Sequence, residues 1–425
     1  MRISTSESEP KDTLAQEGAL PTRPTPLWHN RDYLLLWGGQ IVSSVGSRVS
    51  LVALPLLLVF LTHSLAQAGL VAALQGVPYV LLTLPAGALI DRWDRRRVMI
   101  VCDAARAVAL GSVPLAAALG RLSLAQLCLV ALADGIMEVF FGLAEVSALP
   151  RVVPNEQLAA AGAQSQVTGS LSWLLGPALG GVLFGITPGL PSLADSLSYL
   201  CSVLTLLGIR TRLQGERTAA PMTARGLWDE VRAGLRWLWR APALRFVAVL
   251  TGVLMICAAG YTLLVIAIGQ HLHASDAQIG LVLGAGGVGG LVGALVAGPL
   301  MRRFGFRRVL LWSAWAWALT WPPFAFAPNM LTLGVILAAS FVCVPIYQAT
   351  QFSYRMMSIP DELQGRVSGV FRLIAFGSAP LGLALTGLLL ERWGAVVAVL
   401  VTFAPQLLVV LIATWHRGLK VEEAK

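Results

Sequence analysis

Apolar stretches long enough to cross a bilayer follow one another from Asp32 onward. A helix needs about 20 mostly apolar residues to cross the hydrocarbon core of a membrane. Short polar segments separate the stretches, and two of these segments contain the turn-forming pairs Pro188-Gly189 and Pro328-Asn329. The pattern predicts twelve membrane-spanning helices, over approximately residues 33–61, 67–89, 98–119, 123–147, 158–186, 191–209, 243–270, 277–301, 308–326, 329–354, 363–390 and 394–415.

The longest polar interruption, residues 210–242, divides the predicted helices into two sets of six. We therefore expect two six-helix bundles, over residues 31–209 and 243–417, with cytoplasmic tails at 1–30 and 418–425. The first tail is rich in Ser, Glu, Pro and Thr, which predicts disorder. Between Gly226 and Arg240 the apolar and charged residues fall on opposite helical faces. This segment is expected either to lie in the cytoplasmic headgroup layer or to pack on the protein.

The composition excludes most other classes of protein. Hydrophobic residues make up 56% of the 425 residues and charged residues only 12%, whereas soluble domains carry about 25% charged residues. The five cysteines are scattered through apolar stretches without metal-ligand spacing. No nucleotide-binding loop and no catalytic constellation is present. We expect a polytopic membrane protein that is not an enzyme, with neither a metal nor a cofactor.

The net charge of +9 is distributed unevenly over the predicted loops. Only Arg121 and Arg392 fall on the side opposite the two termini. The basic residues predicted on the same side as the termini include Arg92, Arg95, Arg96, Arg97, Arg151, Arg302, Arg303, Arg307, Arg308, Arg355, Arg366, Arg417 and Lys420. Because basic loops stay in the cytoplasm, both termini are predicted to be cytoplasmic. The basic residues thus act as topology anchors and do not indicate nucleic acid binding.

The two halves resemble one another in sequence. The segment Gly87–Arg97 follows the second predicted helix, and a similar segment, Gly298–Arg308, follows the eighth. A second pair, residues 153–158 and 359–363, lies at nearly the same half-chain spacing. Parallel repeats of this kind occur in one large transporter fold.

At these residues the chain resembles the major facilitator superfamily, over essentially all of 31–417. The residues that match the superfamily's signature in the loop between helices two and three are Gly87, Asp91, Arg92, Arg95 and Arg96. Those that resemble the core of the proton-antiporter signature on helix five, where small residues let helices pack closely, are Gly176, Pro177, Gly180 and Gly181. Residues 53–55, 148–154 and 361–367 resemble the branch of enterobactin exporters and macrolide-efflux proteins. That branch often has an acid in helix one where this chain reads Gly46-Ser47-Arg48.

A few charged residues fall inside the predicted helices. A charge at mid-bilayer costs about 2.5–3.5 kcal/mol, so such residues usually face a partner or a wet cavity. Asp134 and Glu138 share one face of helix four, and we expect them to line a central cavity and to exchange protons. Arg48 is predicted to be their counter-charge, to hold an anionic part of the substrate, or to form a fixed salt bridge. Asp103 and Arg106, at i and i+3, are predicted to pair with each other, with either a structural or a coupling role.

Other polar residues are candidates for the second wall of the cavity. Tyr347, Gln348 and Gln351 lie on the predicted tenth helix, and Arg372 on the eleventh has no local acid. Aromatic and amide side chains suit a bulky amphipathic ligand. Each of these residues also has a purely structural interpretation. Asp195, at the predicted start of helix six, is expected to cap that helix.

The loop signature predicts a cytoplasmic latch. Asp91 is expected to point at the amino end of helix eleven, around residues 363–367, where free amides attract an anion. Arg92 or Arg95 is expected to meet Glu145 at the end of helix four. These contacts would stabilise the closed cytoplasmic side. The alternative is that these contacts only hold the loop in place and that its basic residues only set the topology.

Together these features predict a secondary exporter in a bacterial plasma (inner) membrane. The cargo is a medium-sized amphipathic compound, such as a drug, an antibiotic or a siderophore, moved by proton antiport with alternating access. A proton-independent carrier that flips lipids or lysolipids is the alternative, and a non-transporting scaffold or receptor is a third. The expected partners are this small substrate and the lipid bilayer, and the protein is expected to be a monomer.

Overall fold

The computed structural model describes residues 26–214, 224–360 and 363–415, and over these ranges the regular secondary structure is entirely helical. The first group of helices consists of α1 (Arg31–Thr62), α2 (Leu65–Ile90), α3 (Arg95–Ala118), α4 (Leu124–Val152), α5 (Leu158–Ile186) and α6 (Leu190–Gly208). The second consists of α8 (Pro242–Ala258), α9 (Tyr261–His271), α10 (Asp276–Phe304), α11 (Phe306–Leu319), α12 (Met330–Ser358), α13 (Gln364–Phe376) and α14 (Ala379–Trp415). The helix α7 (Ala224–Arg240) joins them, and three short 3-10 segments complete the structure, at Leu27–His29, Asn155–Gln157 and Pro322–Phe326.

Side-chain caps explain where several of the helices begin. Ser64, Ser123 and Asp94 each accept a hydrogen bond from a backbone amide in the first turn of α2, α4 and α3 respectively. Ser275 and Gln278 form a reciprocal capping box at the start of α10. Such caps satisfy amides that the helix itself leaves free. They place the polar turns between apolar runs, as the sequence pattern predicts.

Ten helical segments among the described residues are long and apolar enough to cross a membrane, which confirms an all-helical membrane protein. The last of these covers residues 364–415 as one segment. Gly394 has a φ of 76° and interrupts the helical backbone within α14. This break lies at the predicted boundary between the last two helices, 363–390 and 394–415. The predicted seventh helix is broken at Ala259-Gly260 into α8 and α9, and the predicted eleventh is broken at Gly377-Ser378 into α13 and the first part of α14. The predicted ninth corresponds to the 14-residue α11, which the 3-10 segment Pro322–Phe326 follows.

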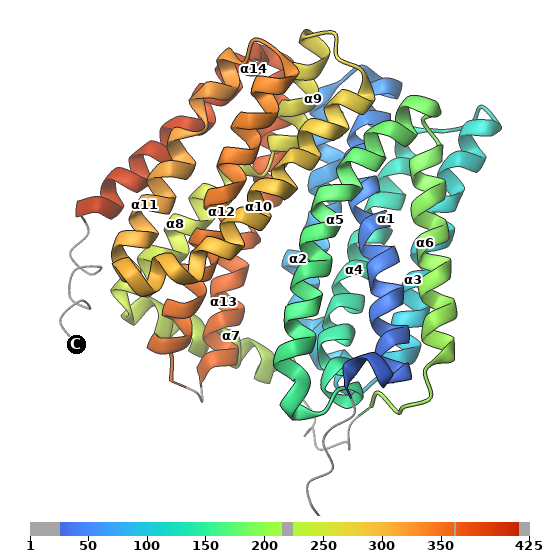
Figure 1. The fold of residues 1–425 in the computed structure, drawn as a ribbon, viewed down its shortest axis with the longest axis vertical. Helices are drawn as coiled ribbons and strands as arrows, with labels where there is room; N and C mark the ends of the chain where they lie inside the picture. The colour runs from blue at the N-terminus through green and yellow to red at the C-terminus, as the bar shows by residue number, and fades with distance from the viewer. Residues whose placement is uncertain (1–25, 215–223, 361–362, 416–425) are drawn as a thin grey trace, which may run out of the picture.

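The two groups of helices meet closely at one end of the molecule, which we name the closed end. They converge at the top of the view in Figure 1 and diverge toward the bottom, the open end. Across this boundary α5 packs on α10, and α2 packs on α14. A methyl group added to Gly181 would lie 2.7 Å from the Cα of Gly280, and one added to Gly69 would lie 3.0 Å from the Cα of Gly387. Glycine thus permits direct backbone contact between the two groups.

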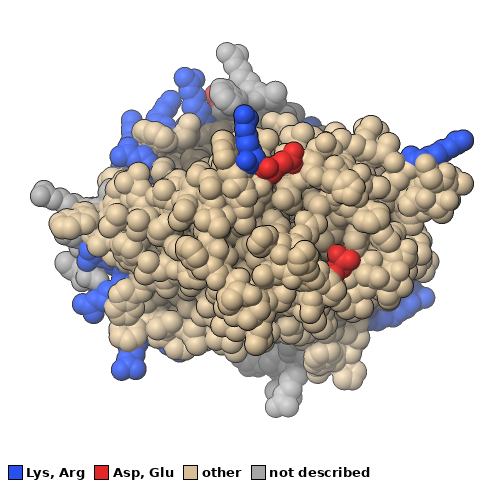
Figure 2. Space-filling view, turned by 90° about the horizontal axis from the view of Figure 1, so that it is seen from above, with Lys and Arg blue, Asp and Glu red and all other residues tan. Residues whose placement is uncertain are grey.

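The closed end carries few charges. Figure 2 looks onto this end and shows a surface that is almost entirely uncharged, with a few acidic and basic side chains. The distribution agrees with the scarcity of basic residues predicted for this side of the membrane.

The helix α7 crosses the open end and packs on α13 and α8 (Figure 1). Leu238 is fully buried in the core of the second group, and a methyl added to Gly234 would lie 2.7 Å from the carbonyl oxygen of Arg366. Of the two positions predicted for this segment, the structure shows packing on the protein. Residues 209–214 contact the first group of helices, because the Thr211 amide donates a hydrogen bond to the Asp32 carboxylate of α1 at 2.8 Å.

Candidate functional site

A buried arginine and two carboxylates form the centre of the first group of helices. The Arg106 Nε lies 2.7 Å from the Asp134 Oδ1, and its Nη1 lies 2.7 Å from the Glu138 Oε2. Gln75 on α2 donates to the other oxygen of Asp134 at 2.7 Å. One guanidinium therefore joins α3 to two positions on α4, and a neutral amide completes the environment of Asp134. We refer to Arg106, Asp134, Glu138 and the nearby Asp103 as the Arg106 cluster.

Aromatic and hydroxyl groups enclose this guanidinium from the other side. Its carbon lies 4.3 Å from the centre of the Tyr199 ring on α6. The Tyr199 hydroxyl is hydrogen bonded to the Ser47 hydroxyl on α1 at 2.7 Å. Stacking of this kind stabilises a buried cation. The Arg106 side chain is only 5% exposed, so the cluster lies in the interior of the helix group.

Glu138 is the accessible member of the cluster. Its side chain is 63% exposed, whereas that of Asp134 is 10% exposed. Leu129, which faces outward from α4, lies nine residues earlier, and nine steps of about 100° place Glu138 on the opposite side of the helix. The exposed carboxylate therefore faces the interior of the structure and not the surface that would contact lipid.

Asp103 does not make the contact predicted for it. The sequence predicts an ion pair with Arg106, but Arg106 reaches across to α4. Asp103 is fully buried without an ion pair in the described part of the chain, and the neutral Ser202 hydroxyl is the polar group beside it. The i, i+3 spacing places Asp103 and Arg106 on one face of α3. The long Arg106 side chain instead pairs with two carboxylates on α4, because two ion pairs are electrostatically more favourable than one.

Two further predictions about charged residues are wrong in their contacts. Arg48 is not the counter-charge of the acids on α4, since its guanidinium carbon lies 4.3 Å from the centre of the Trp173 ring. Asp195 is not a cap, because α6 begins at Leu190 and the Asp195 carboxylate accepts hydrogen bonds from Ser50 and Ser198.

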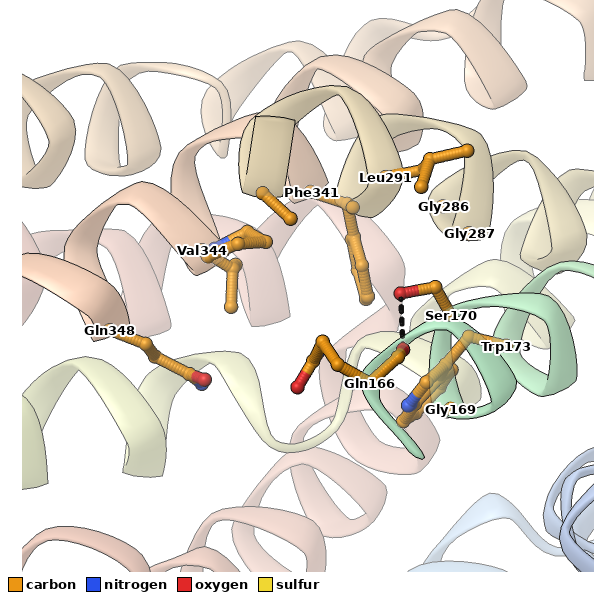
Figure 3. Close-up of a pocket in the computed structure, with 13 residues that line it drawn as sticks. Gln166, Gly169, Ser170, Trp173, Gly286, Gly287, Leu291, Phe341, Val344 and Gln348 are labelled. Atoms are coloured by element: carbon orange, nitrogen blue, oxygen red, sulfur yellow. Dashed lines mark hydrogen bonds between the residues drawn. The ribbon is translucent and has the colours of Figure 1, made fainter. Parts of the chain in front are cut away.

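A cavity lies between the two groups of helices. It has a volume of about 280 Å³. As Figure 3 shows, Gln166, Ser170 and Trp173 of α5 line one side, and Phe341 and Gln348 of α12 line the other. Gly286 and Gly287 of α10 form part of the same wall, where the lack of side chains leaves space. The Trp173 and Phe341 rings lie 6.3 Å apart between centres, so aromatic faces from both groups border the cavity.

Two adjoining cavities extend this space in opposite directions. One, of about 210 Å³, shares Trp173 and Phe341, and further aromatic residues that line it include Tyr261 and Trp321. The other, of about 520 Å³, shares Gln166 and Gln348 and lies toward the open end. The residues that line this second cavity are Gln166, Ala294, Ala297, Pro345, Gln348, Ala349, Gln351, Phe352, Arg355, Arg372 and Phe376.

Three of the four residues predicted for the second wall of the cavity do line a cavity. Gln348, Gln351 and Arg372 line the 520 Å³ cavity. Tyr347 does not, because it is fully buried within the second group and its hydroxyl bonds that of Thr251 at 2.8 Å. Arg355, predicted only to be a topology anchor, also lines the cavity. This residue lies directly after the predicted helix 329–354, whereas the observed α12 continues to Ser358 and carries Arg355 inward.

The loop after α2 is held within the first group of helices. Asp91 is 57% exposed and lies 3.9 Å from Arg95, with no described contact to residues 363–367. Arg95 donates to the Ser147 carbonyl at 2.8 Å, and Arg96 donates to the Leu206 carbonyl at 2.9 Å.

The predicted acidic partner of this loop is not engaged. Glu145 has no ion pair within the described part of the chain, so the predicted contact with Arg92 or Arg95 is absent. Arg92 is exposed, and a methyl added to Gly87 would meet nothing within 4 Å. Residues 361–362, which precede the predicted docking point of Asp91, lie outside the described residues.

The glycines that resemble the antiporter signature lie at close helix contacts. A methyl added to Gly176 would lie 2.2 Å from the Arg48 Cβ, and one added to Gly180 would lie 2.7 Å from the Val49 carbonyl oxygen. Both positions bring α5 against α1, and Gly181 brings it against α10. Pro177 is buried within α5. This helix therefore joins the first group internally and also joins it to the second.

The family model described as transmembrane secretion effector matches residues 24–425. The chain belongs to this family of major facilitator superfamily transporters. The multidrug efflux pump Tap of Mycolicibacterium fortuitum is 27% identical over 90% of this chain and 95% of its own length. The enterobactin exporter EntS of Citrobacter koseri is 29% identical over 82% of each chain. The chain is thus a membrane transporter of an efflux family, and not an enzyme.

Solved structures show the same fold. The nucleoside transporter NupG superposes with a TM-score of 0.74 at 14% identity, over 91% of this chain and 98% of the other. A bacterial homologue of the iron transporter ferroportin gives a TM-score of 0.71 in its inward-facing state, at 19% identity over 91% and 98% of the two chains. In its outward-facing state that homologue superposes with a TM-score of 0.59, at 20% identity over 91% of this chain and 98% of the other.

Proposed function

We propose that this transporter of the secretion effector family exports a medium-sized amphipathic compound across a bacterial inner membrane. Efflux is the activity named for the relatives Tap and EntS. The cavity between the helix groups, bordered by Trp173 and Phe341, suits a ligand with an aromatic or apolar body. Twelve crossings with both termini in the cytoplasm follow under three pairings of the helices: α8 crosses together with α9, α11 together with the 3-10 segment that follows it, and α13 together with the part of α14 before Gly394. The part of α14 after Gly394 is then the twelfth crossing.

Alternating access is the mechanism that the shape of the boundary supports. The space between α2 and the facing helices α13 and α14 widens from the closed end toward the open end. An added methyl at Gly76 would lie 2.8 Å from Pro380, one at Gly377 would lie 3.4 Å from Val80, and one at Gly369 would lie 3.9 Å from Leu84. The higher TM-score against the inward-facing ferroportin homologue agrees with an inward-open state. Rocking of the two groups about the cavity would then expose it to the other side.

Proton antiport is the driving reaction that we infer from the Arg106 cluster. One guanidinium bonds Asp134 and Glu138, and Asp103, which has no ion pair among the described residues, lies buried beside it on α3. Three ionised carboxylates around a single cation would leave net negative charge in the membrane interior, which is costly. Uptake of a proton removes part of that cost. Glu138 is the exposed member and therefore the entry point for the proton.

Everted membrane vesicles test this mechanism. Dye uptake is measured after a pH gradient is imposed, with and without an uncoupler, for the wild type, Glu138→Gln and Asp103→Asn. The exposed Glu156 provides a matched control, Glu156→Gln. We expect the uncoupler to stop uptake by the wild type and the control, and each cluster variant to lose gradient-driven uptake. Full uptake by both cluster variants would refute the assignment.

The lipid-flipping alternative is separated in the same vesicles. A fluorescent phospholipid replaces the dye, and its transfer between leaflets is followed with a membrane-impermeant quencher. Transfer that continues after the uncoupler is added, together with no driven dye uptake, would favour a proton-independent lipid carrier over the exporter.

A further inference from the structure

Arg355 is a buried cation at the wall of the larger cavity. It lies near the end of α12 and is 4% exposed, and it lines the 520 Å³ space together with Arg372 of α13. Its guanidinium carbon lies 4.3 Å from the centre of the Phe371 ring. The Nε and Nη1 atoms of Arg355 are buried without a hydrogen-bond partner. The ring contact stabilises one face of the guanidinium and leaves the Nε and Nη1 donors without an acceptor.

Among the described residues, the charges around Arg355 do not balance. In residues 26–214, 224–360 and 363–415 no carboxylate lies within ion-pair distance of Arg355 or Arg372. The charged group that acts on Arg355 is Arg372, which has the same sign. A buried charge is ordinarily paired, because removing it from water without a partner is costly. This part of the cavity therefore lacks an anion.

Gln351 extends the polar surface by one helical turn. It is 3% exposed, lines the same cavity, and its Oε1 is buried without a partner. Gln348 lines this cavity and also the two beyond it, which are bordered by Trp173 and Phe341. Unpaired donors therefore border the cavity at one end of this set of three adjoining cavities, and aromatic rings border the cavities at the other end.

We propose that Arg355 and Arg372 form a binding subsite for an anionic group of the cargo. A carboxylate, sulfonate or phosphate fits the fork of a guanidinium, which can donate two parallel hydrogen bonds. The aromatic or apolar body of the same molecule would lie toward Trp173. The inference rests on the exporter function proposed above and narrows its cargo to amphipathic anions. An anionic lipid headgroup has the same chemistry and is the competing occupant.

Binding is measured by fluorescence anisotropy of two matched probe pairs, with purified protein in nanodiscs of phosphatidylcholine. The anions are fluorescein and 1-pyrenebutyrate, and their counterparts are the cation rhodamine 123 and the neutral 1-pyrenebutanol. The variants are Arg355→Gln and Arg355→Lys. Arg302→Gln is the control, because Arg302 is an exposed arginine at the end of α10 that does not line the cavity.

We expect Arg355→Gln to weaken binding of both anions by about tenfold or more, with the counterparts changed less than about twofold and Arg355→Lys intermediate. Equal losses for anions and counterparts would identify a structural role and overturn the proposal, as would unchanged anion affinity or no anion binding by the wild type. Nanodiscs that contain phosphatidylglycerol form a second arm. Displacement of the anions by this lipid in the wild type, but not in Arg355→Gln, would assign the subsite to lipid and overturn the cargo assignment.

These outcomes are distinguishable from failure of the exporter proposal. The binding measurements need no gradient, so anion selectivity that depends on Arg355 supports the subsite even if vesicles show no driven uptake. Conversely, gradient-driven uptake without anion selectivity would leave export intact and would overturn the subsite alone.

Discussion

The glycine contact at the closed end gives a quantitative test of how this transporter changes shape. Gly181 of α5 faces Gly280 of α10, and a methyl added to Gly181 would lie 2.3 Å from the Asp276 carbonyl oxygen. Carbon and carbonyl oxygen ordinarily approach to about 3.3–3.6 Å. The substitution Gly181→Ala therefore requires the two helices to separate by about 1 Å at this point.

The cost of that separation falls mainly on the state in which the closed end is packed. Overpacking by a methyl group costs about 1–3 kcal/mol. Because about 1.4 kcal/mol corresponds to a tenfold change in an equilibrium constant, the ratio of inward-open to outward-open molecules should fall by about 5- to 150-fold. A state in which α5 and α10 have parted at this end does not contain the clash.

Double electron–electron resonance on a cysteine-free background measures this shift. Spin labels at Arg121 and Arg392, exposed residues predicted on the same side of the membrane, report the distance across the closed end. We expect Gly181→Ala to move the distribution toward longer distances. Gly185→Ala is the matched control, because a methyl there, one turn along α5, meets nothing within 4 Å. Equal distributions for the wild type and Gly181→Ala would refute the clash argument.

Three further predictions concern charged and aromatic side chains. Arg106→Gln should lower the thermal unfolding midpoint in scanning fluorimetry, because removing one partner of a buried ion pair costs about 3–5 kcal/mol. Arg106→Lys should recover part of this loss. Equal midpoints for the wild type and Arg106→Gln would contradict the buried cluster. Asp91 makes no latch contact with the described residues while the open end is open, so the latch hypothesis requires its contact to form when that end closes. Asp91→Asn should then abolish vesicle uptake while immunoblots show normal membrane insertion, and normal uptake would contradict the hypothesis. Trp173→Ala should weaken dye binding measured by anisotropy, since it removes an aromatic face of the cavity and the ring beneath Arg48, whereas Trp173→Phe should retain part of it.

The helical framework could be predicted because its causes are local. Apolar runs of sufficient length, with Ser64, Ser123 and Asp94 before their first turns, specify where helices begin. Breaks inside an apolar run are less visible in sequence. The breaks at Ala259-Gly260 and Gly377-Ser378 interrupt the predicted helices 243–270 and 363–390, whose hydropathy alone indicates uninterrupted runs. The short α11 depends on Pro322, which begins the 3-10 segment that follows it.

The partners of the charged residues could be predicted only in part, because they depend on the packing of distant helices. Spacing along α4 places Asp134 and Glu138 on one face, as predicted, but it does not reveal that the cation between them comes from α3. Pairing with these acids was one of the alternatives predicted for Arg48, but in the folded chain its guanidinium lies over the Trp173 ring. Sequence separation within one helix therefore identifies the residues of the site better than it identifies their contacts.

The packing of α7 has a consequence for following the motion of single molecules. Since Leu238 and Gly234 are seated on the second group of helices, the amphipathic helix should travel with that group as the pump cycles. A fluorophore at the exposed Asp229 would then move with the second group, and one at Arg97 at the start of α3 would serve as the reference on the first group. Energy transfer between the two dyes should rise and fall once per turnover, without any label inside the membrane.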